Sequence, residues 1–196
     1  MSTLIDQLNV RAHDPATATD EESGSIPVGS PATEAQIRDA EQQLGFLLPP
    51  LLRKIYGSVG NGGFGPGAGI FDLATLVKNY TERRHPKTGR SWPVQLLPIC
   101  EWGAKIETSL DCTDVDVAVI RHDPNMPKAD VNDRVPPSKH YAKAGTVKEA
   151  CWIESFSFEQ WLQGWVDGKR LFYAAYSRDD EDVEDLMDED EEDVEE

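Results

Sequence analysis

The feature that most constrains this chain is a glycine-rich stretch that follows an amphipathic segment. Seven of the fifteen glycines lie between Gly57 and Gly69, and the centre of the stretch reads Gly60-Asn61-Gly62-Gly63-Phe64-Gly65-Pro66. Because glycine adopts positive φ without steric cost, such a stretch lets the main chain turn sharply and pass close to other elements. We expect Phe64 to anchor this loop and Gly60 to end the preceding helix in the left-handed conformation.

The same stretch satisfies, as a string, the Gly-x-Gly-x-x-Gly pattern of dinucleotide-binding proteins through Gly60, Gly62 and Gly65. That chemistry requires a strand before the glycines and a helix after them, so that phosphate lies at a helix N-terminus. Here residues 50–59 predict a helix before the loop, and Pro66 lies where the phosphate-binding helix would have to begin. The order of elements favours a structural loop, and we expect no nucleotide or other cofactor.

The net charge of −17 is concentrated at the C-terminal end. Residues 179–196 hold fourteen acids and no Lys or Arg, whereas residues 1–178 hold 22 acids and 19 bases, a net charge of −3. A block of like charge repels itself and buries too little apolar surface to fold alone, which predicts a disordered tail over 177–196. Within the tail, Val183, Leu186 and Met187 have the spacing of one face of a helix. Two interpretations stay open: a partner orders one helical turn here, or the tail serves only to keep the protein soluble.

The composition predicts a cytoplasmic protein with one domain. The 196 residues suffice for one sizeable core. Three cysteines at scattered spacings indicate reduced thiols, and the first residues lack the basic and apolar regions of a signal peptide. No run approaches the ~20 apolar residues that a membrane helix needs, so we expect no membrane association.

Helical periodicity is clearest after residue 33. Thr33 and Gln36 form a capping-box pattern at the start of a helix over 34–44. Further helices are predicted over 50–59 and 73–84. A last helix carries an aromatic stripe with i, i+3, i+4, i+7 spacing, which predicts packing on a sheet rather than a partner groove: Phe158, Trp161, Leu162 and Trp165.

Between these helices the chain has the character of β-structure. Apolar runs predict strands of a twisted, mainly antiparallel sheet over 96–102, 104–110, 115–121 and 147–156. Helices followed by strands and a closing helix indicate the α+β class, in one domain over 33–176. Residues 1–32 are interpreted as a short helix with a flexible linker, and 122–145 as a long loop without a core pattern.

No set of residues predicts catalysis or metal binding. The four histidines are far apart in the sequence, and no Cys-x-x-Cys or His-Glu-x-x-His pattern occurs. Asp111, Asp114 and Asp116 lack the glycine turn and closing glutamate of a calcium loop, so a polar strand connection is the better interpretation. We therefore expect no enzyme and no metal site.

A local basic segment stands out at the end of the third predicted helix: Lys78, Arg83, Arg84, Lys87 and Arg90. Direct nucleic-acid binding is disfavoured, because the acidic tail would repel phosphate. A solvated helix end is the favoured interpretation. Docking of the tail on this segment is a second hypothesis.

The run Leu44-Gly45-Phe46-Leu47-Leu48-Pro49-Pro50, followed by the glycine stretch and Ile70-Phe71, is similar to the hallmark of the SUKH superfamily. That superfamily groups fungal Smi/Knr-type cell-wall regulators with bacterial immunity proteins. The run from Leu97 to Gly103 and the helix that follows Ser157 occur in the expected order. The resemblance covers residues 33–172 and departs from a minimal member at the N-terminal linker, the 122–145 loop and the tail.

The resemblance implies a single α+β domain without catalysis, in which helices pack on a twisted sheet. It also implies a cytoplasmic protein that binds a cognate toxin, often a nuclease or nucleic-acid deaminase. Complementary charge would speed encounter with a cationic toxin. The candidate binding residues are tail acids: Asp182, Glu184, Asp185, Asp188 and Glu189. The alternative is a regulatory or scaffold domain whose linker and tail recruit several partners weakly.

Overall fold

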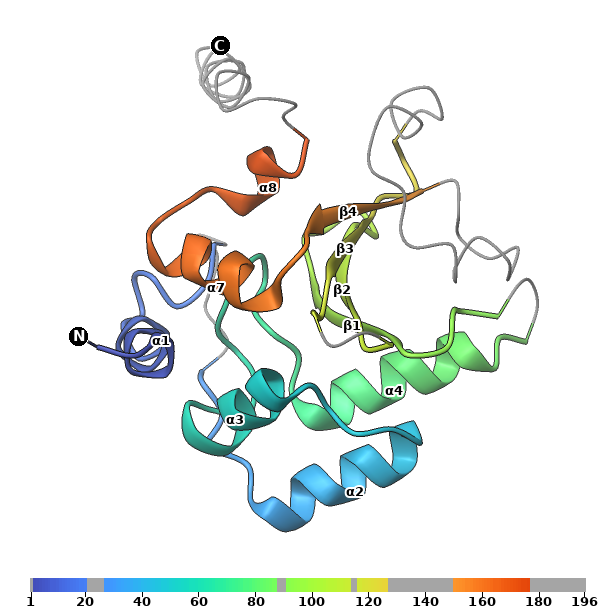
Figure 1. Cartoon of the computed structure of the whole chain (residues 1–196), viewed down its shortest axis with the longest axis horizontal. Coiled ribbons are helices and arrows are strands. Elements are labelled where there is room, and N and C mark those ends of the chain that lie inside the picture. Colours follow the sequence, from blue (N-terminus) through green and yellow to red (C-terminus); the bar gives the residue numbers. More distant parts are fainter. Residues whose placement is uncertain (1, 21–26, 88–90, 114–115, 127–149, 177–196) are drawn as a thin grey trace.

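The computed structural model of the chain describes residues 2–20, 27–87, 91–113, 116–126 and 150–176 (Figure 1). These residues form six helices and a four-stranded antiparallel sheet, which confirms the α+β class. The helices are α1 (Leu4–Ala12), α2 (Glu34–Leu44), α3 (Pro50–Ser58), α4 (Leu73–Arg84), α7 (Phe158–Val166) and α8 (Leu171–Ala174). The strands are β1 (Leu96–Glu101), β2 (Glu107–Asp111), β3 (Val119–His122) and β4 (Cys151–Ser155).

The sheet is a meander in which sequence neighbours pair in the order β1-β2-β3-β4. The register places Thr108 opposite Arg121, and Arg121 opposite Trp152, so these side chains share one face. The pairing shifts by one residue near Pro98, which has no N–H to donate to the ladder. Helix α4 packs against β1 and α7 packs against β4, and α2 and α3 extend the α4 side (Figure 1).

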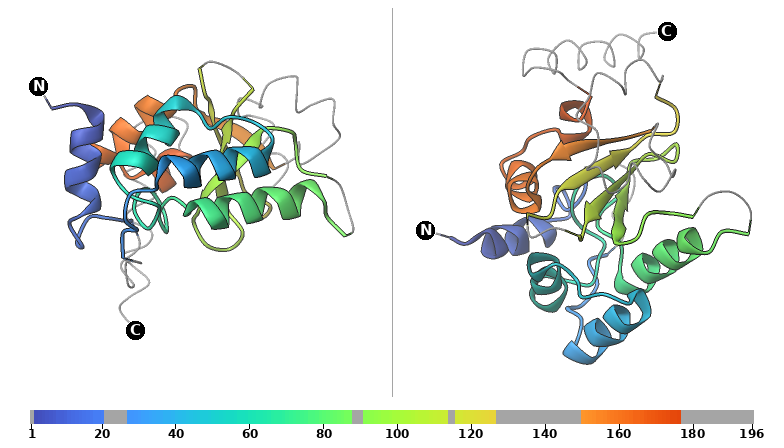
Figure 2. Two further views of the ribbon diagram at one scale, coloured as in Figure 1. Left: turned by 90° about the horizontal axis from the view of Figure 1, so that it is seen from below. Right: turned by 45° about the vertical axis from the view of Figure 1, so that its right-hand side comes forward.

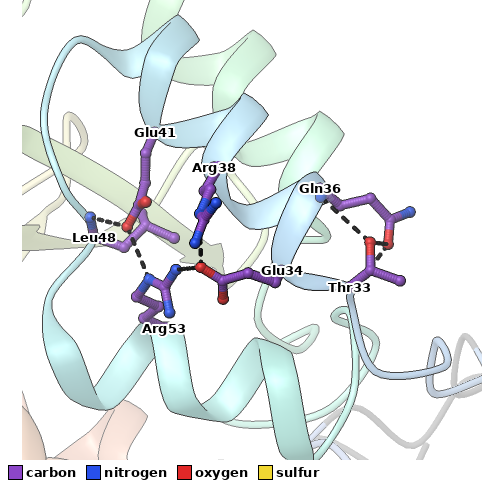
Figure 3. Close-up of polar contacts among 7 residues, drawn as sticks. All are labelled: Thr33, Glu34, Gln36, Arg38, Glu41, Leu48 and Arg53. Carbon is purple, nitrogen blue, oxygen red and sulfur yellow. Dashed lines mark hydrogen bonds and ion pairs between the residues drawn. The ribbon is translucent and has the colours of Figure 1, made fainter.

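Several sequence predictions are confirmed by these elements. The Thr33 side chain accepts a hydrogen bond from the Gln36 N–H, and the Gln36 side chain accepts one from the Thr33 N–H (Figure 3). The whole aromatic stripe of α7 is buried in the core. Phe64 has no exposed surface and anchors the glycine loop.

Helices α2 and α3 are joined by a polar cluster that the sequence did not indicate (Figure 3). Arg53 of α3 pairs with Glu34 at the start of α2 and, at 3.3 Å, with Glu41 in its third turn. Glu41 Oε1 also accepts the Leu48 N–H at 3.1 Å, although the Glu41 residue is only 7% exposed. Arg53 therefore links α3 to two glutamates of α2, and Glu41 also binds the connection between the two helices.

Strand β1 begins at Leu96 as predicted, whereas the other three strands begin later than predicted. Ala104 and Lys105 adopt positive φ in a turn closed by the Ile106 N–H and the Gly103 carbonyl, so β2 begins at Glu107. Strand β3 begins at Val119 rather than at residue 115, and β4 begins at Cys151. Most of the predicted 122–145 loop lies outside the described residues.

The N-terminal segment differs from the predicted flexible linker. Helix α1 lies against α7, where Gln163 donates a hydrogen bond to Gln7 at 3.0 Å (Figure 2). Further on, Ala18 O accepts the Gly65 N–H at 2.7 Å and Gly29 O accepts the Asn61 N–H at 3.1 Å. The segment docks because it satisfies main-chain donors of the glycine loop that have no strand neighbour. A domain boundary at residue 33 remains a prediction.

Gly60 does not have the role predicted for it. Helix α3 ends at Ser58, its C-terminal cap is Val59 with φ −100°, and Gly60 is not among the glycines with positive φ. What Gly60 requires is space, because a Cβ there would lie 2.6 Å from Val28 Cγ1 and 2.8 Å from Gly29 O. The docked N-terminal segment therefore leaves no room for a side chain at this position.

We expect Gly62→Ala to destabilise the fold far more than Gly45→Ala. Both glycines have φ near +80°, but a Cβ on Gly62 would lie 2.5 Å from Asp72 N, whereas nothing lies within 4 Å of one on Gly45. The left-handed conformation alone costs about 1–2 kcal/mol for alanine, and main-chain overlap adds about 1–3 kcal/mol. Urea denaturation of the two variants measures the difference. Equal losses would show that the close approach at Gly62 has no energetic consequence.

Candidate functional site

The predicted loop residues form a junction at which several main-chain donors are already in use. The N–H groups of Gly63, Gly65 and Gly67 donate to Ile70 O, Ala18 O and the Asp20 carboxylate, respectively, at 3.0, 2.7 and 3.0 Å. The first N–H groups of α4, which comes after the loop, are bound by the side chains of Asn61 and Asp72. The N–H groups named here are occupied by the protein itself, so they are not available to a phosphate.

A pocket of about 420 Å³ opens beside this loop. We call it the loop–α8 pocket, because Gly67 lines one side and the turn into α8 lines the other. Segments far apart in the sequence contribute its remaining walls. The lining residues are Arg11, Asp20, Gly67, Trp102 and residues 168–173.

Asp20 and Arg11, which line this pocket, are already engaged with neighbouring groups. Asp20 accepts hydrogen bonds from the Gly67 N–H at 3.0 Å and from Trp165 Nε1 at 2.9 Å, and lies 3.8 Å from Arg11. Burial raises the pKa of Asp20, and those hydrogen bonds and the arginine oppose it. The Arg11 guanidinium stacks 3.9 Å above Trp165 and donates to the Trp165 and Thr17 carbonyls.

The other two cations of the pocket remain available. Lys169 and Arg170 are exposed and form no ion pair with any of the residues that the structure describes. The Arg170 guanidinium lies 4.5 Å from the Tyr173 ring. The loop–α8 pocket thus combines an excess of positive charge over its one described acid, Asp20, with aromatic surface, which suits an acidic ligand with an apolar face.

Sequence reasoning missed this pocket, because no local pattern joins its segments. Arg11 and Asp20 lie in the predicted helix and linker, and Trp102 was assigned to a strand. The run Lys169-Arg170-Leu171-Phe172-Tyr173 is a local signal, with two cations followed by three large apolar residues.

Beneath the pocket lies a buried ion pair. Arg121 of β3 has no exposed surface, and its Nη2 donates to Glu154 of β4, whose side chain is 4% exposed, at 2.9 Å. Glu154 also accepts the Trp161 indole N–H at 2.7 Å. The guanidinium lies 4.3 Å from the Trp102 ring and 5.9 Å from the Phe172 ring. Trp102 and Phe172 therefore both line the pocket and pack against the Arg121 guanidinium.

We expect Arg121→Met to lower the free energy of unfolding by about 3–5 kcal/mol, because it leaves the Glu154 carboxylate buried without its cation. The double variant Arg121→Met/Glu154→Gln should lose less than the sum of the two single variants. Urea denaturation of all four proteins gives the coupling energy. Strictly additive losses would contradict a coupled pair.

Another row of chemical groups crosses the opposite face of the sheet. Glu107, His122 and Cys151 are laterally paired on β2, β3 and β4, an arrangement of acid, imidazole and thiol. Burial, with Glu107 nearby, raises the pKa of Cys151 to about 12, so the nucleophilic thiolate is strongly disfavoured. Glu107 itself pairs with Arg83, which stacks 4.9 Å from Trp92. This geometry favours a structural role for the three residues over a catalytic one.

Glu107 should give the protein an acid-sensitive stability. Burial raises its pKa, but the contacts with His122, whose Nδ1 lies 3.8 Å from the carboxylate, and with Arg83 outweigh burial and leave the pKa below its usual value of about 4.5. The contribution is therefore present above about pH 4.5 and is lost as pH falls through the lowered value.

We therefore expect Glu107→Gln to cost about 2 kcal/mol at neutral pH, and this deficit to shrink below about pH 4.5. Urea denaturation between pH 7 and pH 3 measures it. Glu159→Gln on exposed α7 surface is the control and should show no such convergence. A deficit for Glu107→Gln that is independent of pH would contradict the ion pair.

The predicted basic segment is only partly a solvated helix end. Arg83 is engaged with Glu107, and Arg84 donates to Ser91 Oγ at 3.1 Å and to the Trp92 carbonyl. Lys78 and Lys87 are exposed, and Arg90 lies outside the described residues. The candidate tail acids, Asp182, Glu184, Asp185, Asp188 and Glu189, also lie outside them.

Within the described part of the chain, no group of three or more His, Cys, Asp or Glu side chains is placed to hold a metal ion. Among the same residues, no helix has the length and apolar character to cross a membrane.

Comparison with known families shows that residues 31–126 match the SMI1 / KNR4 family (SUKH-1). Residues 31–126 therefore form a domain of the SUKH superfamily. The match confirms the resemblance seen in the sequence. The matched SUKH region contains α2, α3, the glycine loop, α4 and the first three strands, whereas α1, β4, α7 and α8 lie outside it. A comparison with curated proteins gives no match.

Proposed function

We propose that the chain is a non-catalytic, cytoplasmic protein-binding protein of the immunity type, which neutralises a cationic toxin. The observation that carries this proposal is the separation of charge in the sequence. Residues 179–196 hold fourteen acids, while the rest of the chain has a net charge of only −3. Membership of the SUKH superfamily supports a role in binding protein partners.

Electrostatics explains how such a chain would recognise its partner. Enzymes that act on nucleic acids, such as nucleases and nucleic-acid deaminases, have positively charged substrate channels. A dense row of carboxylates has the charge of the phosphates that such a channel binds, and it accelerates encounter. The near-neutral body adds little to this attraction, so the tail acids are the expected recognition element.

The described residues favour binding over catalysis. The buried acids Glu107 and Glu154 are engaged in ion pairs, and Asp20 is held by Arg11, Gly67 and Trp165. Burial raises the pKa of Cys100 and Cys112 as well as that of Cys151. Groups that are paired, buried or protonated in this way are poor bases and nucleophiles.

A regulatory or scaffold role is the second candidate. The observation that favours it is the family match itself, because the matching family carries the names of the Smi/Knr-type proteins. In that case the tail would bind several partners weakly and no dedicated toxin would exist. Affinity and stoichiometry distinguish the two candidates.

The experiment is a titration of the full chain with the purified toxin domain encoded beside its gene. We expect a tight one-to-one complex whose dissociation constant rises at least tenfold between about 50 and 500 mM NaCl, because salt screens the tail charges. Removing five tail charges should weaken it at least tenfold: Asp182→Asn, Glu184→Gln, Asp185→Asn, Asp188→Asn and Glu189→Gln.

The matched control removes five exposed acids of the body: Asp39→Asn, Glu82→Gln, Glu101→Gln, Glu159→Gln and Asp167→Asn. This variant should bind the toxin within about threefold of the unchanged chain, since exposed charges away from a contact contribute little. The absence of any toxin-like neighbour, or a complex that is insensitive to the tail substitutions, would reject the proposal.

A further inference from the structure

Among the described residues that line the loop–α8 pocket, three cations face a single acid: Arg11, Lys169 and Arg170 against Asp20. Asp20 interacts electrostatically with Arg11 and Arg170, whereas Lys169 and Arg170 are exposed and form no ion pair within 4 Å among the described residues. Trp102, Phe172 and Tyr173 supply the apolar part of the lining. A ligand that fits must therefore present carboxylates on one side and apolar groups on the other.

The chain carries such a segment immediately after the pocket wall. We propose that the loop–α8 pocket is the intramolecular docking site of the chain's own acidic segment, residues 179–196. Val183, Leu186 and Met187 have the i, i+3, i+4 spacing that places apolar side chains on one face of a helical turn, and acids occupy the positions between them. The apolar face meets the aromatic rings, and the flanking acids meet Lys169 and Arg170.

The tether makes this contact reachable. Leu186 follows the last residue of α8, Ala174, by twelve residues. Twelve residues span up to about 40 Å when extended, so the apolar turn can return to residues 169–173 of the same segment. A tether of this length gives an effective concentration on the order of millimolar, so a contact too weak to hold a separate peptide is still populated.

The structure also argues against the basic segment of α4 as the docking site. Two of its arginines are engaged internally, Arg83 with Glu107 and Arg84 with Ser91 and the Trp92 carbonyl. The pocket beside Lys78 is lined by aliphatic and polar residues of the described chain, whereas aromatic rings line the pocket beside Lys169 and Arg170. The loop–α8 pocket therefore offers both charge and aromatic surface.

This contact goes beyond the proposed function and does not depend on it. A tail held in the pocket is withheld from other cationic partners, so a partner must compete with Lys169 and Arg170 for the same carboxylates. Docking thereby lowers non-specific binding of a long acidic segment, and a partner with more positive charge displaces it.

The test uses amide and tryptophan indole NMR signals of the full chain. We compare the chain with the five-acid tail variant that carries substitutions at 182, 184, 185, 188 and 189. The signals of residues 169–173 and of the Trp102 indole should differ between the two proteins. Raising NaCl from about 50 to about 500 mM should reduce that difference by at least half, because the screening length falls several-fold.

Two double variants locate the site. Lys169→Gln/Arg170→Gln should abolish the difference between native and neutralised tails, whereas the matched control Lys78→Gln/Lys87→Gln should leave it unchanged. The proposal is overturned if signals 169–173 are the same with both tails, or if only the control variant abolishes the difference. It is also overturned if tenfold dilution of the chain removes the difference, because the tail then docks on a second copy. Toxin binding is measured separately, so either proposal can fail alone.

Discussion

The fold depends on the close main-chain approach of the glycine loop to the segments around it. Positions 60, 62 and 67 each lie so near to other backbone atoms that a Cβ would stand less than 3 Å from a neighbouring main-chain atom. Because of this close approach, the loop forms hydrogen bonds with the N-terminal segment and with the first turn of α4. The chain that follows the loop also binds β1, where the Phe71 N–H donates to Ile99 O at 2.8 Å. Any side chain would separate these elements and leave buried N–H groups without acceptors.

The acidic residues of this protein fall into two groups, those paired with arginine inside the body and those gathered at the C-terminal end. Inside the described body, Glu107 and Glu154 each lie against an arginine, and aromatic rings cover both arginines. Such pairs fix how strands and helices meet, but they leave little charge at the surface. The acids of residues 179–196, by contrast, form a separate block of the sequence that contains no Lys or Arg. Recognition is therefore expected at the tail and at the loop–α8 pocket, and not in the core.

Local patterns were sufficient for most helices and for the fold class. The bounds of α2 and α4 are set by Thr33, Gly45 and the apolar period, because caps and periodicity are properties of neighbouring residues. The strands were placed less well, since Ala104 and Lys105 look like strand residues but adopt positive φ in a turn. The docking of Arg11 on Trp165 joins residues 154 positions apart, and no local pattern encodes that distance.

The sequence by itself determined that this chain is of the α+β class, that it carries a SUKH domain with a glycine loop, and that its negative charge lies at one end. Those properties depend on the spacing of residues along the chain. Only the tertiary structure decided what the glycines approach, which carboxylates are buried, and that Lys169 and Arg170 line the same pocket as Trp102. Those relations depend on packing between distant segments, because van der Waals contact and burial are set by the folded surface and not by residue order.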